Sequence, residues 1–356
     1  MAEQFIRQSG YPAPPAAKPD SVAGEAPLIP TGFDPIAATP EQLDLYGLPP
    51  RPDPKQQPSL YAAWSKLFAQ PLIWVDPLRP LSEDSGPAGH LSGPRYTPTR
   101  FETSQNWSGA YIEPNGGNMF VLLIGGWTVP TPKLPPNAPS HPPVAATYNC
   151  SNWIGLDGQR RYLNSSLPQV GTEQILVVNP NGSQSIETQA WFQWWARNEV
   201  TIRKTTITEV PVRPGDYVIA ALWVIDKARV SVIIHNLTTG KAHRRFGSPP
   251  QVRQRGGTQA TPIVSGATAE WITERPAVPG SAEMYLFPDY TSVTFDCCVA
   301  GAARGPGPAT AEAVLRGARF LRMYEVLADP PRTGFISMPV KVSDTSVTTT
   351  YGDFSN

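Results

Sequence analysis

The segment PGDYVIAALWVIDKARVSVIIHNLTTG, residues 214–240, contains two apolar runs that are bounded by turn residues. The runs occupy residues 216–225 and 229–236, and in the second run apolar residues alternate with polar ones except for a slip at Ile233. Alternation with a period of two is typical of a strand that is buried on one face. Proline, glycine and asparagine at the ends of the runs favour turns. The segment therefore predicts two β-strands set between turns.

Runs of this kind recur along the chain from Ser104 onward, separated by glycine, proline, asparagine and aspartate. We also expect one short helix, at residues 310–316. So many short strands with so little helix predict two stacked antiparallel sheets, that is, an all-β sandwich or jelly roll. The expected strands lie near residues 106–112, 119–127, 150–156, 174–179, 186–195, 199–209, 216–225, 229–236, 268–274, 282–287, 291–299 and 319–325.

The composition narrows the class of protein further. The chain has 356 residues, of which 42 are proline, and this much proline disfavours long helices. Twenty-nine basic residues balance 29 acidic ones, which argues against a nucleic-acid or anionic-membrane partner that is bound through bulk charge. The longest apolar runs, residues 119–127 and 218–225, are too short to span a bilayer. The first ten residues, MAEQFIRQSG, lack the pattern of a signal peptide.

Residues 1–100 differ from the rest of the chain and contain 19 of the 42 prolines. We expect one helix after the cap Thr39, closed by Gly47, and a second from Ser59 to Gln70. Because an extended chain with two short helices cannot form much of a core alone, this leader must lie on something else or remain loose. Residues 82–100 are polar and rich in glycine and proline, as in a linker. We therefore divide the chain into a leader, residues 1–100, and a β-sandwich domain, residues 101–356.

Cysteine and histidine give little support for metal or nucleophilic chemistry. No pair of cysteines has a zinc-binding spacing, and no histidine lies in a protease motif, so we expect no metal and no cofactor. The three cysteines favour buried thiols, and one disulfide from Cys150 to Cys297 or Cys298 is the alternative. The four histidines are expected in turns or at the surface: His90, His141, His235 and His243.

Polar side chains among aromatic ones are the remaining candidates for a site. In the expected strand 269–274, Glu270 and Glu274 point one way and Trp271 the other. Gln193 shares a face with Trp191 and Trp195. Aromatic walls with a few carboxylates and amides are typical of a groove that binds a polymer, and plain sheet core is the alternative. Two further segments carry such residues: Trp153 to Asp157 and Gln169 to Glu173.

Nine such blocks, taken in order over residues 104–300, resemble the glutamic peptidases, or eqolisins. The resemblance implies a concanavalin-like sandwich that binds a polypeptide substrate, with Gln169 and Glu270 as the catalytic residues. The blocks are Asn106-Trp-Ser-Gly-Ala110, Gly126-Trp-Thr-Val-Pro130, Trp153-Ile-Gly-Leu-Asp157, Gln169-Val-Gly-Thr-Glu173, Ala190-Trp-Phe-Gln-Trp-Trp195, Val212-Arg-Pro-Gly-Asp216, Asn236-Leu-Thr-Thr-Gly240, Ala269-Glu-Trp-Ile272 and Phe287-Pro-Asp-Tyr-Thr-Ser-Val-Thr-Phe295.

The chain also departs from the family pattern. Asp157 matches the family's strand aspartate, whereas Glu173 stands where the family has aspartate. Gln193 replaces the glutamate of the family's W-Y-E-W-Y segment, so the site loses one carboxylate. We expect Asp157, Glu173, Trp153, Trp191, Gln193 and Trp195 to bind substrate or to support the catalytic pair.

The implied chemistry is hydrolysis of a peptide bond by an activated water. Glu270 would take a proton from water and return it to the leaving amine, and the amide of Gln169 would stabilise the oxyanion. Because free glutamate has a pKa of about 4.3, we expect an endopeptidase that works in acid. Two alternatives are a non-catalytic sandwich that binds peptide or carbohydrate, and a glycoside hydrolase with a pair of acids.

The leader suggests regulation. We expect residues 1–100 to lie across the sandwich as a propeptide that is cut between Ser82 and Arg100, and a strap that stays bound is the equal alternative. The resemblance favours a secreted protein, whereas the missing signal pattern leaves the cytoplasm open.

Overall fold

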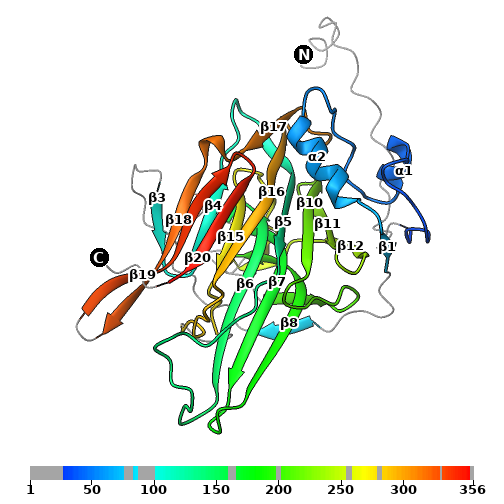
Figure 1. Ribbon diagram of the computed structural model, residues 1–356. Helices are drawn as coiled ribbons and strands as arrows, with labels where there is room; N and C mark the ends of the chain where they lie inside the picture. The colour runs from blue at the N-terminus through cyan, green and yellow to red at the C-terminus, as the bar shows by residue number, and fades with distance from the viewer. Residues whose placement is uncertain are drawn as a thin grey trace, which may run out of the picture.

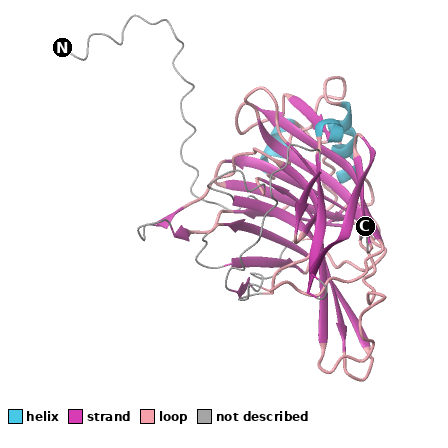
Figure 2. Cartoon of the chain, turned by 90° about the vertical axis from the view of Figure 1, so that its left-hand side faces the viewer, coloured by secondary structure: helices cyan, strands magenta, loops and turns pink. Residues whose placement is uncertain are grey.

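The computed structural model describes residues 27–75, 83–86, 101–158, 166–197, 202–253, 259–278, 283–328 and 331–352. Strands dominate this part of the chain, and the two α-helices lie in the leader (Figures 1 and 2). The helices are α1 (Pro40–Leu45) and α2 (Pro58–Leu67), and one 3-10 turn is η1 (Leu315–Gly317). The strands are β1 (Ile73–Trp74), β2 (Glu83–Gly86), β3 (Phe101–Ser104), β4 (Trp107–Ile112), β5 (Met119–Thr128), β6 (Ala146–Leu156), β7 (Ser166–Val178), β8 (Gln184–Ala196), β9 (Ile202–Ile207), β10 (Tyr217–Asp226), β11 (Arg229–Asn236), β12 (Lys241–Gly247), β13 (Val252–Arg253), β14 (Gln259–Ala260), β15 (Ala269–Glu274), β16 (Ser292–Ala303), β17 (Ala311–Val314), β18 (Arg319–Ala328), β19 (Pro331–Ser343) and β20 (Ser346–Tyr351).

Eighteen of the described strands belong to one hydrogen-bonded sheet that folds over into two layers. The β7 layer runs in the order β2, β9, β8, β7, β6, β15, β4, β18, and the β5 layer in the order β20, β16, β5, β10, β11, β12, β1. β19 pairs with both β18 and β20 and so connects the layers. The predicted two-layer β-sandwich is confirmed.

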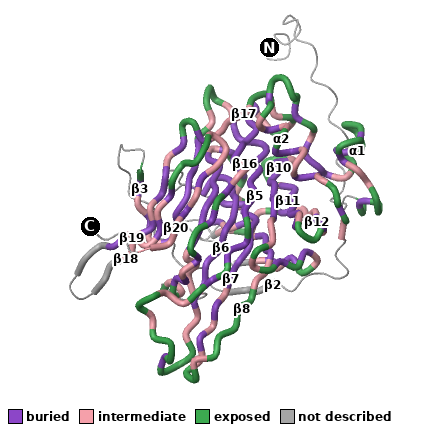
Figure 3. The backbone as a smooth tube through the Cα atoms, viewed as in Figure 1, coloured by how far each residue is buried: buried purple, intermediate pink, exposed green. Residues whose placement is uncertain are grey.

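The two layers pack face to face, and alternate residues of each strand enter the core between them. Trp271 of β15 donates its indole N–H to Ile124 O of β5 at 2.9 Å, and Trp127 of β5 donates to Thr172 Oγ1 of β7 at 2.9 Å. Both rings are fully buried. Figure 3 shows that central strands of the sandwich, such as β5, are coloured as buried along most of their length. These indoles therefore join the layers by packing and by hydrogen bonds at once.

The predicted strand that is least like its observed counterpart is β7. The sequence pattern predicts residues 174–179, but the strand begins at Ser166, because neither Pro168 nor Gly171 interrupts it. Pairing with β6 ends at Gln169, so Pro168 lies beyond the last residue that would need an N–H on that side. A Cβ at Gly171 would lie 2.4 Å from Asn152 O, so glycine allows the close approach of β6 and β7.

Other local predictions need correction. Residues 310–316 are not a helix: residues 311–314 pair with β16 as β17, and a 3-10 turn follows. The expected strand 282–287 is reduced to isolated bridges within its described part. The sequence pattern also does not predict β3, β12, β19 and β20, which are short or carry many charged and hydroxyl side chains.

Some predictions about the leader helices, the histidines and the cysteines are confirmed, and others are wrong. Thr39 caps α1 in a capping box, as predicted, but α2 begins at Pro58 and ends at Leu67, and Ser59 is not its cap. His235 and His243 are buried rather than at the surface, whereas His141 is exposed and His90 lies outside the described residues. All three cysteines are free thiols, and the disulfide alternative is not found. The described residues contain no helix with the length and apolar character that crossing a membrane requires.

Candidate active site

One row of residues across the β7 layer carries most of the predicted site. Directly paired residues of neighbouring strands point to the same face of a sheet. Glu270 of β15 pairs with Gly155 of β6, which pairs with Gln169 of β7, which pairs with Gln193 of β8. The row therefore sets Glu270 and Gln169 on one face, with a glycine between them. The pairing extends this row to Tyr111 at one end and Lys204 at the other.

This face is turned away from the core between the layers. Its aromatic and aliphatic residues form a separate cluster, which contains Trp107, Tyr111, Trp153, Leu167, Trp191, Ile272 and Leu321, with Trp195 at its border. Their neighbours in sequence, such as Ile154 and Phe192, belong to the main core instead. The predicted sharing of one face by Trp191, Gln193 and Trp195 is confirmed.

Gly155 stands between the two candidate catalytic residues in the row. Neighbouring strands lie about 4.8 Å apart, so the backbones at Glu270 and Gln169 are roughly 10 Å from each other. A carboxylate and a carboxamide can each span part of that distance. A side chain at Gly155 would stand between them, and its Cβ would lie 2.7 Å from Leu167 Cδ1 and 3.3 Å from Gln169 Cβ. The row therefore sets an acid and an amide on either side of a glycine, and the side chains of Leu167 and Trp153 pack over that glycine.

Glu270 is held from the end of β6. Its side chain is 1% exposed, and Oε1 accepts a hydrogen bond from the backbone N–H of Gly158 at 3.0 Å. Burial beside Trp153 and Ile272 places this carboxyl in apolar surroundings. One oxygen is thus oriented by the backbone of the turn that follows β6.

Asp157 fixes that turn and does not lie in the row. It adopts a left-handed backbone, with φ of 68°, and its carboxylate accepts hydrogen bonds from the N–H groups of Ser265, Gly266 and Ala267 and from Ser265 Oγ. Burial raises the pKa of Asp157, and these hydrogen bonds oppose the rise. Asp157 therefore joins the turn after β6 to the loop that leads into β15, the strand of Glu270.

Gln169 and Gln193 form an amide pair. Gln169 Nε2 donates to Gln193 Oε1 at 3.2 Å, and Gln169 is 5% exposed. Gln169 Oε1 is buried and has no hydrogen-bond partner within the described ranges. A buried acceptor without a partner carries a free-energy cost of about 1–3 kcal/mol, which a bound water or substrate group would relieve.

Glu173 sits further along β7 and is fully engaged. Its carboxylate forms an ion pair with Lys204 of β9 and accepts hydrogen bonds from Gln189 and, at 2.8 Å, from Asn149. Burial alone would raise the pKa of Glu173, but the charge of Lys204 and these hydrogen bonds hold the pKa below its ordinary value. Glu173 is therefore a fixed negative charge on β7, four residues after Gln169. No local pattern points to Lys204, since its pairing depends on register across three strands.

Glu274 is a second buried carboxyl on the same face. The sequence pattern predicts that it shares this face with Glu270 but does not identify it as a site residue. Trp153 Nε1 donates to Glu274 Oε2 at 2.7 Å, and Asn106 Nδ2 donates to Oε1 at 3.2 Å. Burial raises the pKa of Glu274 to about 7, against the lowering effect of these donors. Trp153, packed edge-on against Trp107 with ring centroids 5.1 Å apart, is thus oriented by Glu274.

The arrangement suits hydrolysis with one working carboxyl. Asp157 and Glu173 are both occupied by several donors, so neither offers Glu270 the second free acid that a glycoside hydrolase needs. Within the described residues no group of three or more histidine, cysteine, aspartate or glutamate side chains could hold a metal ion.

Comparisons with known proteins agree with the sequence pattern. The family model for the peptidase A4 family matches residues 105–330. Similar solved structures include scytalido-glutamic peptidase with a transition-state-analogue inhibitor, at 19% identity and a TM-score of 0.47, covering 70% of this chain and 98% of that one. SCP-B, an eqolisin in complex with a tripeptide, has 18% identity and a TM-score of 0.45, with the same coverage of 70% and 98%. Aspergilloglutamic peptidase from Aspergillus niger has 22% identity and a TM-score of 0.42, covering 58% of this chain and 99% of that one. No curated protein matches the chain.

Proposed function

This chain belongs to the peptidase A4 family, the glutamic peptidases or eqolisins, and is therefore a peptidase, and we propose that Gln169 and Glu270 carry out its reaction. The observation that carries the proposal is the row across the β7 layer, in which these two residues share a face on either side of Gly155. An amide and a carboxyl in that relation can act on the two sides of one substrate carbonyl.

The proposed reaction begins with a water between the two side chains. Glu270, as a carboxylate, takes a proton from this water, and the water oxygen bonds to the carbonyl carbon of the substrate. The carbonyl oxygen becomes an oxyanion, which accepts a hydrogen bond from the amide of Gln169. Such donors contribute about 2.7–4 kcal/mol in other oxyanion holes. The proton on Glu270 then passes to the nitrogen as the carbon–nitrogen bond breaks, which regenerates the carboxylate and releases an acid and an amine.

The amide pair supports this role for Gln169. A hydrogen bond between Gln169 and Gln193 holds the side chain in place, and either amide can serve as the donor. Gln169 Nε2 has two N–H groups, so one can donate to Gln193 while the other remains for the oxyanion, and Gln169 Oε1 is left to accept from a bound water.

We further propose that the enzyme works in acid and outside the cell. A single carboxyl must be ionised to accept the proton, and glutamate meets that condition down to a pH near its reference pKa of about 4.3. The secreted location follows from the resemblance to the family alone.

We propose that the leader, residues 1–100, limits access to the site through its part after Val75 until the chain is cut between Ser82 and Arg100. Two observations on the sandwich domain, residues 101–356, support this limit on access. Gln169 and Glu270 are 5% and 1% exposed in the uncut chain, so a polypeptide reaches them only after some covering segment moves. Backbone pairing of β2 with β9 attaches residues 83–86 to the edge of the β7 layer. The rest of the expected linker lies outside the described residues.

The test is cleavage of an unfolded protein substrate over a range of pH by wild type, Glu270→Gln and Glu187→Gln. Glu187 lies on β8 in the same layer but is exposed, so the same chemical change there controls for the loss of a carboxyl. We expect activity in acid for wild type and for Glu187→Gln, and none for Glu270→Gln. Equal cleavage by all three proteins would remove Glu270 from the mechanism, and binding without cleavage by wild type would favour the non-catalytic sandwich.

A further inference from the structure

The outer face of the β5 layer, on the far side of the sandwich from the candidate site, is apolar and fully covered. Its rows contain Ile124, Ile219, Ala221 and Ile233, and each is at most 1% exposed. Strands that are buried on both faces read as continuous apolar runs. This explains the slip at Ile233, an apolar residue that is buried on the outer face of β11.

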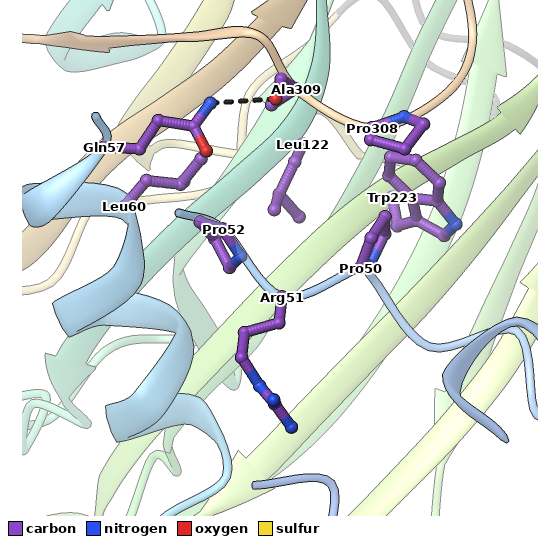
Figure 4. Close-up of a pocket in the computed structure, with 9 residues that line it drawn as sticks. All are labelled: Pro50, Arg51, Pro52, Gln57, Leu60, Leu122, Trp223, Pro308 and Ala309. Carbon is purple, nitrogen blue, oxygen red and sulfur yellow. Dashed lines mark hydrogen bonds between the residues drawn. The ribbon is translucent and has the colours of Figure 1, made fainter. Parts of the chain in front are cut away.

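The leader supplies the cover. Helix α2 packs on β5, β10, β16 and β17 (Figure 1). Its residues Leu60, Trp64 and Leu67 are fully buried in the same hydrophobic cluster as the sandwich core. Figure 4 shows the contact at one end of α2, where Pro50, Pro52 and Leu60 face Leu122, Trp223 and Pro308. The helix is thus a third layer and not a loose appendage.

The sandwich is shaped for this helix. Gly301 of β16 is a strand residue with an ordinary backbone, and a Cβ there would lie 2.9 Å from Leu60 Cδ2 and 2.7 Å from Ala309 Cβ. Gly47 and Phe246 show the reverse fit, since a Cβ at Gly47 of the leader would lie 2.4 Å from the Phe246 ring. Glycine in these two places permits a contact that any other residue would disturb.

Polar groups of the sandwich hold both ends of α2. At its start, Glu312 Oε2 accepts the N–H of Leu60 at 2.8 Å. Gln57 Nε2 donates to Ala309 O at 2.9 Å, as Figure 4 shows. Glu312 thus caps a helix whose own N-cap residue, Gln57, provides no side-chain cap. At its end, Lys66 binds Tyr217 at 2.6 Å and Asp296 at 3.2 Å.

The segment after α2 is held through its backbone. His235 lies against the carbonyl oxygens of Leu67, at 2.8 Å, and Pro71, at 3.2 Å. β1 then pairs in parallel with β12, so that Ile73 and Val75 donate to Gly240 and Ala242. A segment that completes a sheet edge and buries a helix resembles a permanent part of a fold, because removing it would expose both.

We infer that residues 27–75 are a permanent third layer of the enzyme, which stays bound to the sandwich after the chain is cut between residues 76 and 100. The cut frees only the residues between Val75 and the cleavage site, and because α2 lies on the far side from the row of Glu270 and Gln169, the bound layer does not block the site. The inference does not depend on which residues are catalytic, since it concerns binding alone.

The experiment is to insert a recognition sequence for a site-specific protease between residues 87 and 100 of the full chain, cut it, and separate the products by gel filtration under native conditions. We expect the piece that contains residues 27–75 to elute with the sandwich, as shown by the masses in the peak. Elution of that piece apart from the sandwich overturns the inference, whether the sandwich then stays in solution or precipitates.

Two matched variants test the fitted contact. Gly301→Leu fills the space of Leu60, whereas Gly305→Leu adds the same side chain where no atom lies within 4 Å. In the cut protein, we expect Gly301→Leu to speed dissociation of the leader piece about tenfold or more and Gly305→Leu to leave it unchanged. Equal dissociation rates in the two variants would mean that α2 does not dock where Gly301 makes room for it. Measuring cleavage of substrate by the same samples separates this result from any failure of the proposed chemistry.

Discussion

Gln169 and Gln193 face each other across β7 and β8, and their amides share one hydrogen bond of 3.2 Å. The family pattern has a carboxylate where this chain has Gln193. The pair therefore keeps the contact to the amide that we propose as catalytic while removing a charge from the row, and the role of that contact can be measured directly.

Replacing Gln193 with alanine should lower the rate without unfolding the protein. The loss of one positioning hydrogen bond costs about 0.5–1.5 kcal/mol, which corresponds to a fall of about 2- to 13-fold in kcat with less change in KM. Gln193→Glu keeps an oxygen that accepts the N–H of Gln169 and should recover most of the loss. Steady-state kinetics on a peptide substrate measures both, with Gln184→Ala, at the exposed end of the same strand, as the control. A glutamate variant as slow as the alanine variant would show that the hydrogen bond is not what matters.

Gly155 should be intolerant of even one methyl group. The Cβ of Gly155→Ala would lie between Glu270 and Gln169 in the row and 2.7 Å from Leu167 Cδ1. We expect kcat/KM to fall about 100-fold or more, because a displacement of about 1 Å at the reacting atoms can have that effect. The cost in unfolding free energy should be about 1–3 kcal/mol, measured by denaturant titration. Gly305→Ala, in open space, is the control. A folded Gly155→Ala protein with full activity would contradict the proposed position of the water.

Strong local patterns allowed the sequence to predict much of this fold. Alternation in residues 229–236 and the continuous run of residues 218–225 mark β11 and β10 because both strands are buried. β12 was missed because Lys241, Arg244 and Arg245 interrupt its apolar pattern at a half-exposed edge of the layer. Local sequence does not reveal which face the leader covers, although the slip at Ile233 and the lack of a core pattern in residues 1–100 both indicate a covering segment.

The candidate site could be predicted residue by residue but not as a geometry. The selection of Glu270 and Gln169 rests on the resemblance. Their common face and the position of Gly155 between them depend on the register of β15, β6 and β7. The sequence pattern does not predict the roles of Lys204 and Glu274 for the same reason, because the partner of each lies on a strand that is distant in sequence. Hydrogen bonds of the site join residues that are 16 to 168 positions apart, and such pairing is set by the whole sheet and not by any local motif.

Lys204→Met should destabilise the protein most at neutral pH. The pKa of Glu173 lies below its ordinary value in the folded chain, so its ionisation contributes stability above the unfolded pKa, and this contribution is lost as the pH falls through the folded pKa. Without Lys204, the buried carboxylate loses its cation, which we expect to cost about 1–3 kcal/mol near neutral pH and less in acid. Chemical unfolding at several pH values measures the difference, with Lys227→Met at an exposed turn as the control. A loss of stability that is the same at every pH would exclude the ion pair as its cause.

Glu274 should make the wild-type fold more stable in acid than at neutral pH. Burial raises its pKa to about 7 in the folded chain, from 4.5 without burial, so the folded state holds a proton over this range that the unfolded state has released. The stability that this proton provides is full below the unfolded pKa and is lost as the pH rises through the folded pKa. A shift of this size corresponds to about 3 kcal/mol between the two ends of the range.

Glu274→Gln keeps an oxygen that accepts from Trp153 but cannot ionise, so it should match wild type in unfolding free energy near pH 4 and exceed it near pH 8 by roughly that amount. Glu187→Gln, which changes an exposed carboxyl of the same layer, should leave the wild-type slope intact. If Glu274→Gln shows the same dependence on pH as wild type, the proton is held elsewhere, and the acid-stable character of this fold has to come from a different buried group.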